Sequence, residues 1–411
     1  MKRTLTFALM LTFLAAFLLS GCGYNRTYTS VTTHVDQTTT EDDPSILRAE
    51  TYQELVSSIL HFVSEGEETG TVRLYQYTGD VESDLEAACQ EVLEEDPLGA
   101  YALSGLEHDY SRIVSYYECN FTFVFRRSAE EIDAVSTADS TVSFREQLQQ
   151  TMDEFGDSLA LRTSRTITEE DIQEMVTEYY YDTPTLALGL PSIEVNSYGG
   201  EESSQKIIEV IFNYEQSTEE SLEMQEELLA TAYSLLNDLD ATADASGLWS
   251  IYSELSSYTI YQSMNSNSAY RFLTNQAGAP DGASLSLLLL CQLLGLEAQY
   301  VEGSTDGLDE HGWVMVQIGE TWCHMDLILS DDENGFLHSD DDLLALGYSW
   351  DQTAYPACAG LQLEEETQED TEESEQAVEE ESESSNAVDE ITGLDENTDL
   401  DLSDQLSAIG E

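Results

Sequence analysis

His311 and Asp326 are the residues whose types and spacing point most clearly to chemistry. His311 opens the sequence His-Gly-Trp, and Asp326 follows a short segment that contains Trp322. An imidazole that is oriented by a carboxylate is the proton-transfer part of nucleophilic acyl transfer, in which a thiolate or a hydroxyl attacks a carbonyl. This pair would therefore need a nucleophile elsewhere in the chain.

The segments around these two residues predict a buried helix followed by three strands. The helix is expected over residues 281–294 and the strands over 299–302, 314–318 and 321–325, with a loop at 303–310. This order resembles the transglutaminase-like superfamily, in which a Cys begins the helix, a His begins a strand and an Asp ends the next strand. The resemblance covers about 140 residues and implies an α+β fold in which His311 and Asp326 belong to a Cys-His-Asp triad.

The sequence departs from this family where the nucleophile is expected. The family has a Gly-x-Cys-x-Gly pattern, and this chain reads Gly-Ala-Pro-Asp-Gly from Gly278 to Gly282, so that Pro280 takes the place of the Cys. Proline fits the first turn of a helix, because an N–H there would have no intrahelical partner. The fold is therefore expected to tolerate the change, and His311 and Asp326 are predicted to be remnants of a catalytic site.

Other thiols and hydroxyls are poorly placed to replace the missing nucleophile. Cys291 lies eleven residues beyond Pro280, which is about 16 Å along a helix. Cys323 is three residues before Asp326 on the same strand, so the two side chains should face opposite ways. Ser284 and Ser286 lie one or more turns deeper in the helix. We therefore predict that ordinary transglutaminase activity is absent.

The N-terminus carries an export signal. Lys2 and Arg3 precede an apolar stretch at residues 5–18, which is too short for a permanent membrane span. The next residues, Leu-Ser-Gly-Cys ending at Cys22, resemble the lipobox of bacterial lipoproteins. The resemblance implies that residues 1–21 are removed and that acyl chains on Cys22 anchor the protein at the extracytoplasmic face of the cell membrane. The alternative is an ordinary secretory signal with a Cys at this place by chance.

Charge and cysteine content exclude several classes of function. The chain has 13 basic and 83 acidic residues among 411, a formal net charge of −70. This balance argues against nucleic-acid binding and against electrostatic docking on an anionic membrane. Five cysteines remain beside Cys22, an odd number without a Cys-x-x-Cys spacing, so neither a zinc site nor a disulfide framework is predicted. We expect no cofactor and no metal.

Composition and hydrophobic periodicity suggest five consecutive parts of an α+β protein. After the signal peptide, a Thr- and Ser-rich stalk is expected at residues 22–44 and a small α+β region at 45–215. The transglutaminase-like domain is expected at 216–362. Residues 363–411 form an acidic tail with few apolar residues, for which disorder is predicted.

Within the first α+β region and the start of the next, the periodicity predicts elements as follows. Helices are expected at 51–64, 83–93, 221–239 and 247–261, with residues 97–99 ending the second of these, and strands at 71–77, 117–125, 193–195 and 207–214. Residues 144–182 are expected to form two helices. The aromatic residues on alternate positions of the 117–125 strand are assigned to the core, and a stacking surface for sugars or peptides is the alternative.

Three functions are consistent with these features. The first is a non-catalytic module that binds a peptide, glycan or protein of the cell envelope. The second is an acyl-transfer enzyme of the transglutaminase or cysteine-protease kind that uses a non-standard nucleophile. The third is an acidic spacer or assembly unit of an envelope complex. The loss of the Cys beside the retained His311 and Asp326 favours the first.

Overall fold

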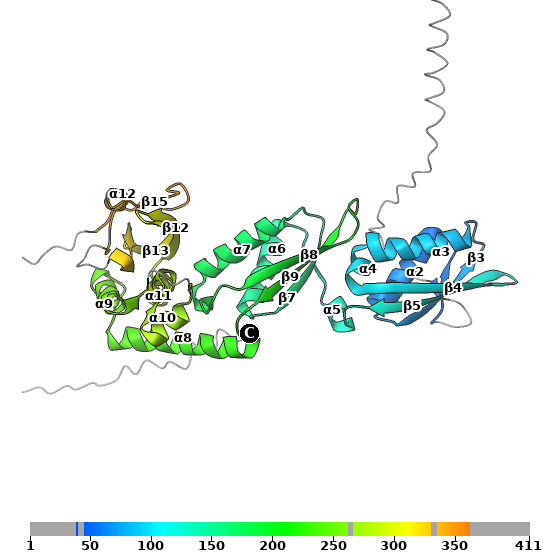
Figure 1. Cartoon of the computed structure of the whole chain (residues 1–411), viewed down its shortest axis with the longest axis horizontal. Coiled ribbons are helices and arrows are strands. Elements are labelled where there is room, and N and C mark those ends of the chain that lie inside the picture. Colours follow the sequence, from blue (N-terminus) through cyan, green and yellow to red (C-terminus); the bar gives the residue numbers. More distant parts are fainter. Residues whose placement is uncertain (1–37, 40–44, 262–265, 330–334, 362–411) are drawn as a thin grey trace, which may run out of the picture. The chain divides into compact units, whose positions relative to one another are not determined.

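The computed structural model describes residues 38–39, 45–261, 266–329 and 335–361. The predicted signal peptide, Cys22, nearly all of the predicted stalk and the predicted acidic tail lie outside these residues. The described part is α+β, as predicted, with three four- or five-stranded sheets and their helices (Figure 1). No helix among the described residues combines the length and the hydropathy that crossing a bilayer requires.

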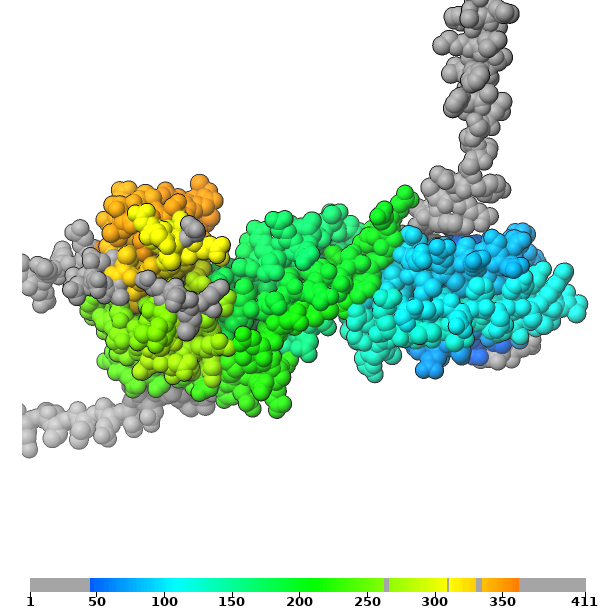
Figure 2. Space-filling model, in the orientation of Figure 1, coloured from blue at the N-terminus to red at the C-terminus, as the bar shows by residue number. Residues whose placement is uncertain are grey.

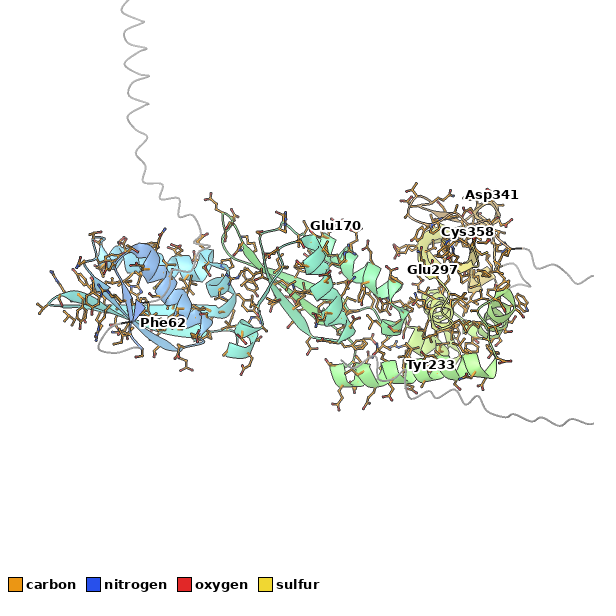
Figure 3. All side chains as sticks on the ribbon, turned by 180° about the vertical axis from the view of Figure 1, so that it is seen from behind. Phe62, Glu170, Tyr233, Glu297, Asp341 and Cys358 are labelled. Carbon is orange, nitrogen blue, oxygen red and sulfur yellow. The ribbon has the colours of Figure 1, made fainter. Side chains whose placement is uncertain are left out.

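The first sheet has the strand order β1-β2-β3-β5-β4 and is antiparallel except for the parallel pair β2 and β3. Its strands are β1 (Thr38–Thr39), β2 (Leu47–Ala49), β3 (Thr69–Tyr75), β4 (Leu103–Ile113) and β5 (Tyr116–Phe125), and its helices are α2 (Tyr52–Ser64), α3 (Val81–Gln90) and α4 (Pro97–Ala102). Phe121 and Phe123 of β5 are buried with these helices, which confirms that the aromatic stripe belongs to the core. Phe62 of α2, labelled in Figure 3, lies against Gly70 of β3, where any larger side chain would meet its ring.

The preceding helical segment ends at Glu95, before residues 97–99, as expected, but two features of this sheet were not foreseen. Residues 97–99 begin helix α4, because Asp96 caps it by accepting hydrogen bonds from the N–H groups of Leu98 and Gly99 at 2.8 and 3.2 Å. Proline at the first position of a helix loses no hydrogen bond. Strand β4 was not predicted. Most of its side chains are exposed, so the sequence carries no alternation there, and the end of the β4–β5 hairpin lies at the surface (Figure 2).

The second sheet has the order β6-β7-β9-β8. Its strands are β6 (Ser136–Thr137), β7 (Ser158–Thr163), β8 (Ser192–Tyr198) and β9 (Lys206–Asn213), accompanied by α5 (Ala129–Asp133), α6 (Thr141–Asp153), α7 (Glu169–Asp182) and a 3₁₀ turn at Pro184–Leu186. The expected strands near 193–195 and 207–214 are confirmed. The expected pair of helices at 144–182 is also present, but β7 lies between them and was missed.

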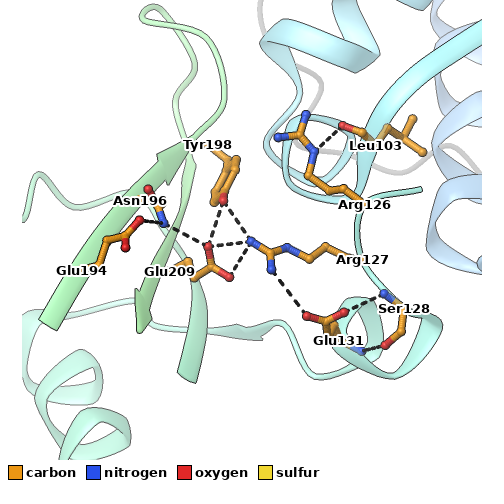
Figure 4. Close-up of polar contacts among 9 residues, drawn as sticks. All are labelled: Leu103, Arg126, Arg127, Ser128, Glu131, Glu194, Asn196, Tyr198 and Glu209. Carbon is orange, nitrogen blue, oxygen red and sulfur yellow. Dashed lines mark hydrogen bonds and ion pairs between the residues drawn. The ribbon is translucent and has the colours of Figure 1, made fainter. Parts of the chain in front are cut away.

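Arg127 joins the first sheet to the second (Figure 4). Its Nη2 donates to the Glu209 carboxylate at 2.7 Å and to the Tyr198 hydroxyl at 3.1 Å, and the Tyr198 hydroxyl donates to Glu209 at 2.8 Å. The guanidinium also lies over the ring of Tyr101, 4.9 Å from its centroid. Because the Glu209 side chain is only 4% exposed, this ion pair is largely shielded from water.

The remaining described residues form helices around a third, antiparallel sheet of order β14-β13-β12-β15. The helices are α8 (Thr218–Asp238), α9 (Ala245–Ser256), α10 (Ala269–Asn275), α11 (Pro280–Leu293) and α12 (Asp340–Ala345). The strands are β12 (Ala298–Thr305), β13 (Leu308–Ile318), β14 (Thr321–Met325) and β15 (Ser349–Trp350), with a 3₁₀ turn at Leu327–Leu329 and a short parallel pair of β10 (Thr259–Ile260) and β11 (Ala277–Gly278).

Three sequence expectations in this part are corrected. The helix expected at 247–261 ends at Ser256, because Thr259 and Ile260 pair with β11. The loop expected at 303–310 is instead a tight hairpin, in which β12 runs to Thr305 and β13 begins at Leu308. As a result, His311 lies inside β13 and does not begin it.

Helix α11 is buried on nearly all sides, which explains its run of leucines. One hydrophobic core extends from Ala138 to Leu337 and contains residues of the second sheet, of α8–α11 and of one face of the third sheet. The other face of the third sheet has a smaller core of Val301, Trp313, Met315, Leu343, Tyr348 and Cys358. By contrast, Tyr233 on α8 (Figure 3) is exposed.

Candidate functional site

His311 and Asp326 meet in the third sheet. His311 is on β13, Asp326 follows β14 directly, and His311 Nε2 lies 2.6 Å from Asp326 Oδ2. Each side chain is only 1% exposed. The pair that the sequence predicted is therefore assembled, but it is sealed from solvent.

Three hydrogen bonds converge on the Asp326 carboxylate. Oδ2 accepts from His311 and from the Tyr348 hydroxyl at 2.5 Å, and Oδ1 accepts from the Ile328 N–H at 3.0 Å. An ionised carboxylate can only accept, so the His311 Nε2–H is the donor in this hydrogen bond. Burial beside the Asp326 charge raises the pKa of Tyr348, which keeps its hydroxyl protonated as a donor.

The backbone of Asp326 is held as firmly as its side chain. Its N–H donates to the Gly335 carbonyl at 2.8 Å, and its carbonyl accepts from the Tyr252 hydroxyl at 3.1 Å. Tyr252 comes from α9, so this contact ties the end of β14 to a helix outside the sheet. Sequence reasoning missed both tyrosines, since an isolated Tyr carries no spacing signal.

Pro280 is the first residue of α11, as the sequence predicted. Ala279 precedes it as the N-cap and provides no side-chain hydrogen bond. One turn on, the Ser284 hydroxyl donates to the Gly312 carbonyl at 2.8 Å, so the beginning of α11 is anchored to the residue after His311. Gly282 lies so close to the Ser268 carbonyl that an added Cβ would be 2.7 Å from its oxygen. This close packing explains the second Gly of the pattern.

Asp281 is the acidic residue next to Pro280 in the first turn of α11. Its Oδ1 accepts from the Tyr300 hydroxyl at 3.2 Å. Burial raises the pKa of Asp281, while the Tyr300 hydrogen bond and the proximity of His311 lower it in part. The Tyr300 hydroxyl also covers Gly312, where a Cβ would be 1.8 Å from it. Asp281 was not among the predicted site residues, although it adjoins Pro280.

Tyr300 connects Asp281 to helix α7. Its ring stacks on Tyr181 of α7, with the centroids 4.4 Å apart and the planes at 20°. Burial raises the pKa of Tyr181 to about 12, and the pKa of Tyr300 is also raised well above its usual value. Both rings are therefore neutral, and the Tyr300 hydroxyl lies beside Asp281.

The other thiols and hydroxyls have partners or surroundings away from His311. The Ser284 hydroxyl is bonded to Gly312 and the Ser286 hydroxyl to the Gly282 carbonyl at 2.7 Å. Cys291 and Cys323 are buried in the large core, and burial raises their pKa values to about 12 and about 11. Among the described residues, no thiol forms a hydrogen bond with His311.

A second histidine, His324 of β14, belongs to a separate series of hydrogen bonds. The Trp313 indole N–H donates to His324 Nδ1 at 3.0 Å, and His324 Nε2 donates to Asp340 Oδ1 at 2.9 Å. Asp340 Oδ2 accepts from the Cys358 N–H at 3.0 Å. Trp313 also stacks against His311, with ring centroids 5.9 Å apart. These hydrogen bonds therefore hold the Trp313 indole in place, and the indole in turn packs against the His311 ring.

The side chains of His324, Asp340 and Cys358 are close enough together to suggest a metal site, since their ligand atoms lie within 4.8 Å of one another. The hydrogen bonds favour a different assignment. An indole N–H can only donate, so His324 Nδ1 is unprotonated and the neutral ring carries its proton on Nε2. Burial lowers the pKa of His324 and raises that of Cys358, which keeps the imidazole neutral and the thiol protonated. The arrangement fits a neutral histidine held by two hydrogen bonds better than it fits a metal centre.

The family comparison agrees with the order of elements around the site. Residues 233–327 match the model of the transglutaminase-like superfamily, a span that includes α11, His311 and Asp326. Residues 233–327 form a transglutaminase-like domain. This domain is confirmed, whereas the roles assigned to His311, Asp326 and Pro280 stay predictions.

The solved structures that resemble this chain are distant. A crystal structure of a TGase is 10% identical, with a TM-score of 0.25, and the match covers 50% of this chain and 62% of that one. A predicted cysteine protease from Cytophaga hutchinsonii is 15% identical, with a TM-score of 0.23, and the match covers 38% of this chain and 67% of that one. The chain thus spans less than two thirds of the TGase structure. The comparison with curated proteins finds no match.

Proposed function

We propose that this protein is a lipid-anchored module of the cell envelope whose transglutaminase-like domain binds a partner without catalysing acyl transfer. One observation carries the proposal: Pro280 begins α11, at the place where the family has its nucleophile, while His311 and Asp326 keep their hydrogen bond. Proline has no side-chain atom that can attack a carbonyl.

The surroundings of the pair support a structural role for it. Asp326 has all of its described hydrogen bonds within the domain, and the His311 and Asp326 side chains are each 1% exposed. A substrate carbonyl could reach His311 only if the residues that bury its side chain moved. The pair then serves to hold β13, the end of β14 and the loop of Tyr348 together, and a partner would bind elsewhere, at the surface of this part of the chain.

A turnover assay tests the absence of catalysis. The purified chain is incubated with glutamine-containing peptides and a primary amine, and the products are followed by mass spectrometry. We expect no transamidation and no hydrolysis above the level of the His311→Ala variant. Turnover in the wild-type chain that His311→Ala abolishes would establish an enzyme with a non-standard nucleophile and overturn the proposal.

A separate experiment tests the anchor. Cells that express the chain are labelled with a fatty acid that carries a detectable group, and membranes are separated from the soluble fraction. The wild-type chain should carry label and sediment with membranes, whereas Cys22→Ala should carry none. Equal labelling of the two forms would contradict lipidation at Cys22.

A further inference from the structure

Strand β12 has one open edge. Its inner edge pairs with β13, and β15 covers only Gly303 and Ser304 on the outer edge. The Glu302 N–H points outward, since it donates to the Tyr355 hydroxyl at 3.3 Å, while the Glu297 carbonyl points inward to the Gln317 N–H at 2.8 Å. Backbone groups alternate along a strand, so those of Ala298 and Tyr300 also point outward.

No described hydrogen bond uses these outward groups of Ala298 and Tyr300. An unpaired strand edge presents N–H and C=O groups in the spacing that another strand needs. Edges of this kind take up extended peptides in several recognition domains, where the peptide adds to the sheet as a further strand.

The open edge forms one wall of a cleft. The cleft has a volume of about 1400 Å³ and runs between β12 and helix α7, with Ala354 and Tyr355 at its side and the stacked rings of Tyr181 and Tyr300 in its lining. Pockets for small molecules typically enclose about 300–1,000 Å³. A longer occupant such as a peptide segment therefore fits this cleft better than a small ligand.

The cleft is strongly negative. Its acidic lining residues are Glu169, Glu170, Glu174, Glu178 and Asp182 of α7, and Glu302 of β12. The described lining contains no Lys, Arg or His, although Arg145 pairs with Glu178 from outside it at 2.6 Å. Neighbouring protein removes part of the hydration of Asp182 and Glu302, and together with nearby carboxylates this raises the pKa of both. A cation placed between the walls would relieve that repulsion.

We propose that an extended peptide segment bearing Lys or Arg side chains binds in this cleft by adding as a strand to the open edge of β12. This proposal names the partner class of the binding module and so rests on the proposed function. The peptide backbone pairs with the outward groups of Ala298 and Tyr300. Its cationic side chains meet Glu302 and Asp182, and their apolar stems lie on the Tyr181 and Tyr355 rings.

The probe for the test is a short capped peptide of alternating lysine and threonine, titrated calorimetrically into the full chain at low ionic strength. A second peptide has proline in place of threonine, which keeps the charge but removes the N–H groups and the conformation that pairing needs. We expect the threonine peptide to bind and the proline peptide to bind at least about tenfold more weakly, a difference of about 1.4 kcal/mol. The same peptide should slow hydrogen exchange at the Ala298 and Tyr300 amides.

A matched pair of double variants separates the cleft from the general charge of the chain. Asp182→Asn with Glu302→Gln removes two charges inside the cleft, and Glu223→Gln with Glu226→Gln removes two exposed charges on α8. The cleft variant should weaken binding about three- to tenfold and the α8 variant should not. No binding, equal binding of the two peptides, or equal effects of the two variants would overturn the proposal. None of these results bears on turnover, so a failure of this proposal can be distinguished from a failure of the proposed function.

Discussion

Asp326 shows at the scale of single residues how the His311 and Asp326 pair contributes to stability. Its carboxylate accepts from His311, Tyr348 and Ile328, and it is withdrawn from water. Removing a hydrogen-bond donor from a buried charge destabilises the folded state. The stability of the fold is therefore enough to account for each of these partners. Retention of His311 and Asp326 therefore does not require catalysis.

Tyr348→Phe tests this structural role. The change removes one hydrogen bond to a buried carboxylate while keeping the ring, so the free energy of unfolding should fall by about 1–3 kcal/mol. Urea denaturation followed by circular dichroism measures it. Tyr233→Phe, at an exposed position of α8, is the control and should leave the free energy of unfolding unchanged. A loss for Tyr348→Phe no larger than that of the control would show that Asp326 does not depend on this donor.

Asp281 makes stability depend on pH. Because burial raises its pKa in the folded state, the folded chain binds this proton more tightly than the unfolded chain. Its contribution to stability is therefore present below the unfolded pKa of about 3.9 and is lost as the pH rises through the folded pKa. Asp281→Asn removes this loss. We expect the variant to gain stability relative to wild type as the pH rises across that window, and a constant difference in thermal unfolding from low to neutral pH would refute this.

At the scale of elements, the sequence predicted those parts whose pattern is set by burial. Helix α11 and strands β12 and β14 were found because their apolar residues face a core, and the order of these elements placed His311 and Asp326 together. Strand β4 was missed because its exposed residues do not alternate. Strand β7 was missed because residues 144–182 were all assigned to two helices, and α10 was missed because its seven residues make only about two helical turns.

The Tyr300 side chain of β12 packs closely over Gly312 of β13. No spacing rule reveals that Tyr300 folds over Gly312, since the contact depends on the pairing of two strands. Gly312→Ala places a methyl group against the Tyr300 hydroxyl and ring, and it should destabilise the domain by about 1–3 kcal/mol. Gly105→Ala on β4, where a Cβ meets only ordinary contacts at 3.6 Å or more, is the control. Equal melting temperatures for the two variants would refute the close contact.

At the scale of the whole molecule, Arg127 is one of the residues that connect the first and second sheets (Figure 4). Arg127→Ala leaves the Glu209 carboxylate buried without its cation, which should cost about 3–5 kcal/mol. The exposed pair of Arg145 and Glu178 provides the control, since Arg145→Ala should cost at most about 1 kcal/mol. Chemical denaturation measures both, and a similar small loss for the two variants would mean that the joint is not held by this ion pair.

The sequence could not predict this joint, since Arg127 and Glu209 are far apart in the chain and lie in separately patterned segments. The same holds for the cleft, whose walls come from α7 and β12. The predicted boundaries between the parts of the chain stay predictions. What the sequence did supply is the identity of residue 280 and its place at the start of α11.

Alkylation of a Pro280→Cys variant tests most directly whether only the nucleophile is missing. Residue 280 is partly exposed, whereas the native thiols of the described part are buried, with pKa values raised to about 12 for Cys89, Cys119 and Cys291. We predict that the new thiol is alkylated well before the native ones, with a midpoint below the usual thiol pKa of about 8.5, and that His311→Ala in the same background raises this midpoint. A pH profile of an ordinary thiol that is unchanged by His311→Ala would contradict the account.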